Sequence, residues 1–122
     1  MILVYAETQD GKLKKSALET VCFGSKMAAA QGSSCVALVL GQADDAGRLG
    51  QYGASEVLQV QDDRLASFDS QAYASVIASI ATSKNATAVI LPDSANGKSI
   101  SEISEICLSF IAPKIKTIFA SE

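Results

Sequence analysis

The sequence predicts an α/β fold, namely a doubly wound, mostly parallel sheet of five strands with helices on both faces. Short segments rich in β-branched and aromatic residues alternate with longer segments of helical periodicity. Two of the short segments, 35–41 and 87–91, are almost continuously apolar, which is typical of strands buried on both faces of a parallel sheet. The helical segments between them are long enough to form the crossovers that parallel neighbours require.

The expected strands limit the possible strand orders of the sheet. They are residues 2–6, 35–41, 56–60, 87–91 and 115–119. With right-handed crossovers, two strand orders are plausible, 3-2-1-4-5 and 2-1-3-4-5. The third strand, Glu-Val-Leu-Gln-Val, is shorter and more polar than the others. This favours the order 3-2-1-4-5, because that order places the third strand at an edge.

Helical spacing and end signals locate the helices. The expected helices cover residues 16–30, 43–50, 70–84 and 99–111. Ser16 with Glu19, and Ser99 with Glu102, have the spacing of a capping box, in which each side chain satisfies a free backbone N–H at the helix start. Gly32 is expected to end the first helix. The third helix carries a stripe of large apolar side chains at helical spacing: Tyr73, Val76, Ile77 and Ile80.

Length and charge limit the classes of function. The 122 residues suffice for one domain with a real core, so a single α/β domain is expected over residues 1–122. The net charge of −3 argues against a nucleic-acid partner, which needs a clustered positive surface. No segment approaches the roughly 18 apolar residues of a membrane span. The opening "MILVYAE" resembles neither a signal peptide nor a transit peptide, so a cytoplasmic location is expected.

Cysteine and histidine usage narrows the chemistry further. Cys22, Cys35 and Cys107 are odd in number and widely spaced, so buried reduced thiols are expected instead of a disulfide or a metal site. The chain contains no histidine, which excludes histidine-dependent triads and imidazole acid–base catalysis. Catalysis by aspartate, glutamate, lysine or cysteine remains open.

Several polar and aromatic residues have ordinary structural explanations. The basic cluster Lys12, Lys14 and Lys15, flanked by Glu7 and Glu19, is expected to be a solvated loop. Adjacent aspartates need not converge on a metal, so a turn or helix-start role is expected for two pairs, Asp44–Asp45 and Asp62–Asp63. The tyrosines are spread along the chain and are expected to serve in packing: Tyr5, Tyr52 and Tyr73.

The segment 90–100, "ILPDSANGKSI", ends like a phosphate-binding P-loop. That motif requires a glycine five residues before its second glycine, where the tight turn lets backbone N–H groups surround a phosphate. Counting back from Gly97 gives Pro92, which lacks both the N–H and the freedom of glycine. The sequence therefore excludes a true P-loop.

A weaker anion site at the same segment remains a hypothesis. Its candidate residues are Ser94, Asn96, Gly97, Lys98 and Ser99. They follow the fourth strand and precede a helix, on the edge where open α/β sheets bind ligands and beside the switch point between strands 1 and 4. The alternative is an ordinary strand-to-helix turn in which glycine serves the backbone. Residue chemistry alone leaves both interpretations open.

Four segments together resemble the N-terminal domain of the electron transfer flavoprotein alpha subunit. They are "ILVYAETQDGKLKKSALE", "VALVLG", "LGQYGASEVLQVQDDRLASFDSQAYASVIASIA" and "VILPDSANGKSI". They occur in the family's order and spacing over residues 1–100. After Ile100 the chain departs from the family pattern, and the family's C-terminal domain, which carries most FAD-binding residues, is absent from it. No FAD-contacting residue can therefore be carried over.

The resemblance implies a subunit-association domain that docks with the electron transfer flavoprotein beta subunit. It implies an electron-carrier component, not an enzyme, in a heterodimer whose FAD passes electrons from dehydrogenases to an acceptor. No FAD is expected on this chain alone, and self-association of the isolated chain is also expected. The alternative from another class is a stand-alone adenine-nucleotide-binding module that uses the loop 94–99. An enzyme using cysteine or carboxylates ranks third.

Overall fold

The computed structural model describes residues 1–9, 11–41, 43–65, 69–92, 97–100 and 116–120. Within these ranges, 3₁₀ helices are labelled η, and the elements follow one another along the chain in a regular alternation. They are β1 (Ile2–Tyr5), β2 (Thr8–Gln9), β3 (Lys12–Leu13), α1 (Lys15–Ala30), β4 (Cys35–Leu40), η1 (Ala46–Tyr52), β5 (Glu56–Val60), η2 (Asp63–Leu65), α2 (Ser70–Ser83), β6 (Ala88–Pro92) and β7 (Lys116–Ala120).

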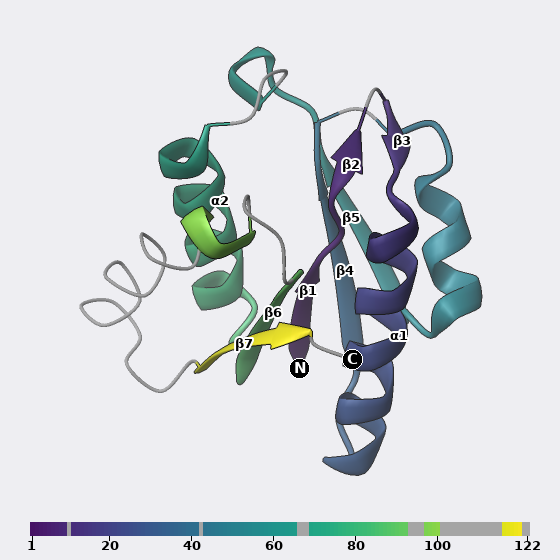
Figure 1. The fold of residues 1–122 in the computed structure, drawn as a ribbon. Helices are drawn as coiled ribbons and strands as arrows, with labels where there is room; N and C mark the ends of the chain where they lie inside the picture. The colour runs from purple at the N-terminus through teal and green to yellow at the C-terminus, as the bar shows by residue number, and fades with distance from the viewer. Residues whose placement is uncertain (10, 42, 66–68, 93–96, 101–115, 121–122) are drawn as a thin grey trace.

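The main sheet has the strand order β5-β4-β1-β6-β7, and all neighbouring strands are parallel (Figure 1). Leu3 of β1 lies opposite Val36 on one side and Val89 on the other. Because β1 pairs with both β4 and β6, the order 2-1-3-4-5 is wrong and the expected 3-2-1-4-5 agrees with the structure. The α/β fold class is confirmed, and the polar strand Glu56–Val60 lies at an edge as expected.

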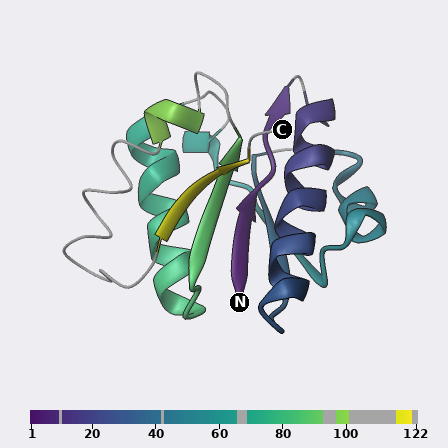
Figure 2. The same ribbon diagram turned by 60° about the horizontal axis from the view of Figure 1, so that its bottom comes forward.

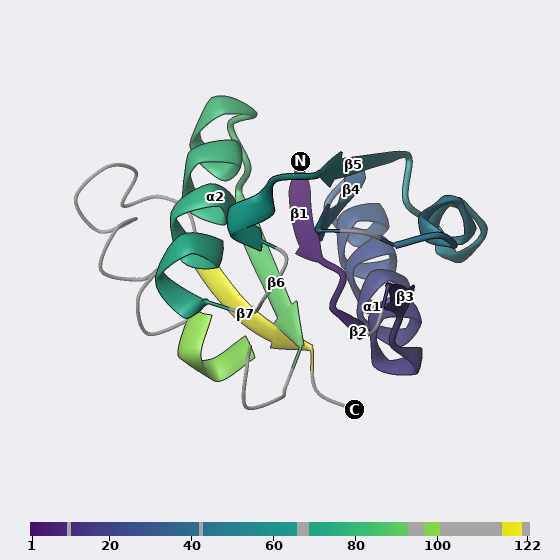
Figure 3. The same ribbon diagram turned by 90° about the horizontal axis from the view of Figure 1, so that it is seen from above.

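Helices cover both faces of this sheet. Figures 2 and 3 show α1 on one face, and α2 with the short helical segment 97–100 on the other. The face under α1 is also covered by η1, whose Leu49 is fully buried in the same cluster as Val21 of α1. The other face packs against Ile77 of α2 and Ile100. The domain therefore has two apolar cores separated by the sheet.

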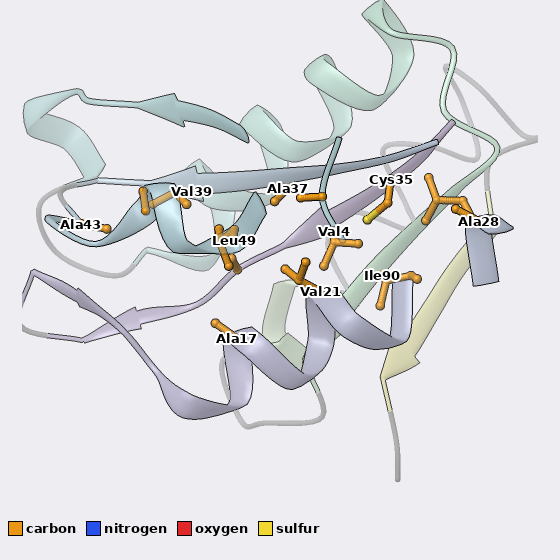
Figure 4. Close-up of a cluster of buried hydrophobic side chains, with 14 of the residues drawn as sticks. Val4, Ala17, Val21, Ala28, Cys35, Ala37, Val39, Ala43, Leu49 and Ile90 are labelled. Atoms are coloured by element: carbon orange, nitrogen blue, oxygen red, sulfur yellow. The ribbon is translucent and has the colours of Figure 1, made fainter. Parts of the chain in front are cut away.

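Alternation along the strands distributes side chains between the two cores. In β1, Ile2 and Val4 belong to the core under α1, whereas Leu3 and Tyr5 belong to the core under α2. All residues of β4 and β6 are buried, which confirms that these nearly continuous apolar segments are enclosed on both faces. Figure 4 shows the first core, with side chains of α1 meeting those of the central strands.

One glycine sets the distance between α1 and the sheet. A Cβ atom built on Gly24 would collide with Cγ2 of Val4, and it would lie 3.3 Å from Cδ1 of Ile90. The absence of a side chain therefore lets the helix backbone rest directly on β1. Ala17 and Ala28, which are also buried on this helix, keep the same close approach.

The end of α1 and the start of α2 follow their sequence signals. The N–H of Gly32 donates to the carbonyl of Ala29, and that of Ser33 donates to the carbonyl of Ala28. With Gly32 at a φ of +66°, this is a Schellman motif, so the expected stop is confirmed. At α2, the carboxylate of Asp69 accepts hydrogen bonds from the two backbone N–H groups at the helix start, 2.9 and 3.3 Å away.

The start of α1 differs from the expectation. The helix already begins at Lys15, so the capping box of Ser16 and Glu19 is wrong. The preceding residue, Lys14, makes no side-chain cap, and its backbone N–H donates instead to the carbonyl of Glu7 at 3.1 Å. The entry into the helix is therefore set by a contact with the end of β1, which no local spacing encodes.

Three further segments differ from the expected elements. The helix expected at 43–50 is the 3₁₀ helix η1 at Ala46–Tyr52, which ends at Gly53 with a φ of +109°. The segment 97–100 is helical from Gly97, so Ser99 lies inside the helix and does not cap it, while Glu102 lies outside the described residues. The antiparallel hairpin of β2 and β3, which pairs Thr8 with Leu13, was not predicted.

Candidate functional site at the carboxyl edge of the sheet

The parallel strands β1, β4 and β6 end at the same edge of the sheet, the carboxyl edge, where open α/β folds bind ligands. Figure 1 shows the hairpin of β2 and β3 extending beyond the end of β1 toward the start of α1. The hairpin is the main difference between this edge and the expected one. Its contacts decide what the edge can hold.

The loop after β4 is bound to the hairpin. The N–H of Asp44 donates to the carbonyl of Gly11 at 3.0 Å, and the N–H of Leu13 donates to Oδ1 of Asp45 at 3.0 Å. Asp45 also lies 3.6 Å from the guanidinium of Arg48. Asp45 directly precedes η1 as expected, but its carboxylate makes no cap there and holds the hairpin instead.

The base of the hairpin contains a buried ion pair. The side chain of Glu7 is only 2% exposed, and its Oε2 lies 2.9 Å from Nζ of Lys14, whose side chain is 32% exposed. The expected solvated loop is therefore wrong for these two residues, whereas Lys12 and Lys15 are exposed as expected. The sequence does contain one indication that Glu7 is buried, because Glu7 directly follows the apolar segment 2–6, which was expected to be a strand.

Two tyrosines pack below this edge. The rings of Tyr5 and Tyr73 meet edge to face, with centroids 6.2 Å apart. The hydroxyl of Tyr73 donates to the carbonyl of Leu65 at 2.8 Å, whereas that of Tyr5, which is 3% exposed, makes no hydrogen bond to any residue in the described ranges. Burial raises the pKa of Tyr5 far above its ordinary value, and Tyr73 and Glu7 raise it further. The expected packing role is confirmed for both tyrosines and for Tyr52, which packs against the core under α1.

The change Tyr5→Phe is expected to reduce the loss of stability at alkaline pH. A group whose pKa is raised by folding contributes stability that is complete below its unfolded pKa, about 10 for tyrosine, and is lost as pH rises above that value. Removing the hydroxyl removes this loss and also a buried donor that has no hydrogen-bond partner among the described residues. Urea unfolding at pH 7 and pH 11 measures the effect, with Tyr52→Phe as the control at a half-buried tyrosine. An equal loss of stability in wild type and Tyr5→Phe would contradict it.

The loop after β6 is described only in part. Gly97 is buried, and a Cβ atom at this position would collide with the carbonyl oxygen of Pro92. The chain's own backbone therefore requires this glycine, which favours the strand-to-helix turn. Lys98 and Ser99 are exposed, and Ser94 and Asn96 lie outside the described residues. The anion site at these five positions stays a prediction.

The thiols and acidic groups do not assemble a reactive centre in the part of the chain that the structure describes. Cys35 is buried, and burial raises its pKa to about 11, so the nucleophilic thiolate is disfavoured. Cys22 is only half-buried, which corrects the expectation of a buried thiol, and Cys107 lies outside the described residues. No group of three or more metal-ligating side chains occurs in the described ranges. No helix within them is long and apolar enough to cross a membrane.

Comparisons with known proteins give one consistent result. The family model described as the electron transfer flavoprotein domain matches residues 2–103. The acryloyl-CoA reductase electron transfer subunit beta of Anaerotignum propionicum is 29% identical over 92 residues, which are 74% of this chain and 25% of that protein. The electron transfer flavoprotein subunit alpha of Clostridium acetobutylicum is 36% identical over 78 residues, 62% of this chain and 23% of that protein. The match thus spans about a quarter of each relative.

Proposed function

Because the chain belongs to the electron transfer flavoprotein domain family, we propose that it is the N-terminal, subunit-association domain of an alpha subunit. The observation that carries this proposal is the family match over residues 2–103, which includes every described strand except β7. The family consists of electron transfer proteins, not classical enzymes. The higher of the two identities, 36%, is to a protein named as an alpha subunit.

The proposed partner is an electron transfer flavoprotein beta subunit. In the proposed complex, FAD passes electrons from dehydrogenases to an acceptor, and this chain contributes the surface on which the beta subunit docks. We place the complex in the cytoplasm, in keeping with the free thiols of Cys22 and Cys35.

Several polar groups described at the carboxyl edge are already engaged and so do not offer a pyrophosphate a site. A pyrophosphate needs free backbone N–H groups or cations, but Lys14 is already bound to the buried carboxylate of Glu7. The N–H groups of Leu13 and Asp44 are likewise used by the hairpin and the loop after β4. The position that a Cβ atom of Gly97 would occupy lies against the carbonyl oxygen of Pro92, so this glycine does not leave room there for a ligand. We therefore assign FAD binding in the proposed complex to groups other than Lys14 and the backbone N–H groups of Leu13 and Asp44.

Co-purification tests the proposed partner. The 122-residue chain is expressed with an affinity-tagged beta subunit from a complete electron transfer flavoprotein, and a stoichiometric complex is expected on gel filtration. The matched alpha subunit of the same flavoprotein serves as the positive control. If that alpha subunit binds the tagged protein and the chain does not, the proposed docking role is wrong.

The isolated chain separates the proposal from the nucleotide-binding alternative. Purified alone, it is expected to show no flavin absorbance in the visible range and weak or no binding of AMP or ATP. A dissociation constant in the low micromolar range, about 8 kcal/mol of binding free energy, would favour the nucleotide-binding module. In that case Lys98→Ala should weaken binding if the loop after β6 is the site.

A further inference from the structure

The hairpin of β2 and β3 is too short to hold its own position. Each of its strands has two residues, and together they form a separate two-stranded sheet beside the main one (Figure 1). A hairpin of this size is at best marginally stable in water unless it packs against other elements. Its position is therefore set by its contacts with the rest of the domain, which fall into two groups, one at its base and one at its tip.

The base of the hairpin is held by buried contacts. The backbone N–H of Lys14 donates to the carbonyl of Glu7, and the ammonium group of Lys14 lies 2.9 Å from the carboxylate of the same residue. Opening the base would separate a buried carboxylate from its cation, which is costly. The N–H of Ala6, the residue before Glu7, donates to the carbonyl of Leu38 and so joins the end of β1 to β4. The base is therefore the fixed end of the hairpin.

The tip of the hairpin is held by two hydrogen bonds near solvent. The N–H of Asp44 donates to the carbonyl of Gly11, and the N–H of Leu13 donates to the carboxylate of Asp45, both at 3.0 Å. Asp44 is exposed, and the side chain of Asp45 is 25% exposed. Water can replace both partners when they separate, so opening the tip costs less than opening the base. Because two adjacent residues of one loop make these bonds, we expect the bonds to break together.

The tip covers one end of the core under α1. Leu13 is half-buried and packs against this core, and Ala43 and Ala46, which flank the two aspartates, are buried members of it. Opening the tip would uncover these apolar side chains. It would also free the backbone N–H groups of Leu13 and Asp44 at the carboxyl edge, where open α/β folds bind ligands. The closed hairpin withholds both the apolar surface and the two donors.

We propose that the hairpin is a strap that opens at its tip while it stays anchored at its base. In the closed state, Asp44 and Asp45 hold the strap against the loop after β4. In the open state, both bonds of the tip are broken, whereas the contacts between Glu7 and Lys14 remain. The rest of the domain keeps its fold in both states. This inference does not depend on the proposed function, because both states belong to the chain alone.

Amide hydrogen exchange, measured residue by residue by NMR on the full chain, tests the strap. In the wild type, the amides of Leu13 and Asp44 should have equal protection factors that depend little on urea, and the amide of Lys14 should exchange at least about tenfold more slowly. Asp45→Ala removes the acceptor of Leu13 only. It should nevertheless speed exchange at Asp44 about tenfold, because the two bonds open together, and leave Lys14 unchanged. Glu19→Ala, which removes an exposed carboxylate on α1, should change none of the three amides.

Gly11→Ala perturbs the strap from the hairpin side. Gly11 has a φ of +78° and open space around its Cβ position, so alanine strains the turn without a clash. Exchange at Leu13 and Asp44 should rise by the same factor, with Gly47→Ala, at an exposed glycine with a negative φ, as the control. The proposal is overturned if Lys14 exchanges as fast as the other two amides in the wild type, since the whole hairpin then detaches. Exchange of Leu13 and Asp44 only by global unfolding, or unequal changes at the two in either variant, also overturns it.

Discussion

A chain that ends at Ile100 is expected to lose at least about 3 kcal/mol of unfolding free energy, and with it most or all of its cooperative transition. The cut removes β7, whose residues Lys116–Ala120 pair with all of β6. The buried strand β6 would then become an edge, with its backbone groups on that side left to water. Small domains have only about 5–15 kcal/mol in total, so a loss of this size approaches the whole stability.

Thermal unfolding of two shortened chains measures this effect. The matched control ends after Ala120, which keeps β7 and removes only residues 121–122. This control should melt like the full chain. If the chain ending at Ile100 also melts at the same midpoint with the same enthalpy, β7 contributes nothing to the fold and the importance assigned to the fifth strand is wrong.

The change Lys14→Met is expected to cost about 3 kcal/mol, because it leaves the buried carboxylate of Glu7 without its cation. Methionine keeps the aliphatic length of lysine, so the loss reports the charge and not the packing. The double change Glu7→Leu, Lys14→Met removes both charges and should recover much of the loss. Urea unfolding midpoints of the four proteins in this cycle provide the measurement.

Lys12→Met is the matched control for this cycle. Lys12 lies in the same hairpin, but its side chain is exposed, so the change should alter stability by less than about 0.5 kcal/mol. A cost for Lys14→Met no larger than that for Lys12→Met would contradict the structural role of the ion pair. The hairpin would then be held mainly by the bonds that join Gly11 and Leu13 to Asp44 and Asp45 of the loop after β4.

Hydrophobic patterning was sufficient to predict the sheet. The nearly continuous apolar segment 35–41 predicted a strand enclosed on both faces, and the polarity of 56–60 predicted a strand at an edge of the sheet. The stop at Gly32 followed from the same kind of local rule. These features depend on properties of one segment at a time, which a sequence displays directly.

The features that were missed depend on contacts between segments. The hairpin strands β2 and β3 have two residues each, too few to show a period, and the hairpin is held by Asp45, which is 32 residues from its partner Leu13. The burial of Glu7 depends on Lys14 folding back over it. Ser16 and Glu19 have the spacing of a capping box, but the helix starts one residue earlier, where the backbone N–H of Lys14 donates to the carbonyl of Glu7. Rules that consider one segment at a time do not include such contacts between segments.

The candidate site was only partly accessible to sequence reasoning. Pro92 argues against a P-loop in the sequence, and the structure adds that Gly97 is needed beside the carbonyl of that same proline. Whether Lys98 and Ser99 receive an anion depends on the loop 93–96, for which spacing alone gave two interpretations. The nucleotide titration of the isolated chain decides between them.

The central position of β1 has a consequence for synthesis on the ribosome. β1 is made before both of its neighbours, since it is hydrogen-bonded on one side to β4 and on the other to β6. Translation proceeds at about 5–20 residues per second, so residues 88–92 follow β1 by roughly 4–17 s. During that interval the nascent strand has a partner for at most one edge. β1 is thus enclosed only after β4, β5 and α2 have been made, and until then its edge beside Val89 is open to other contacts.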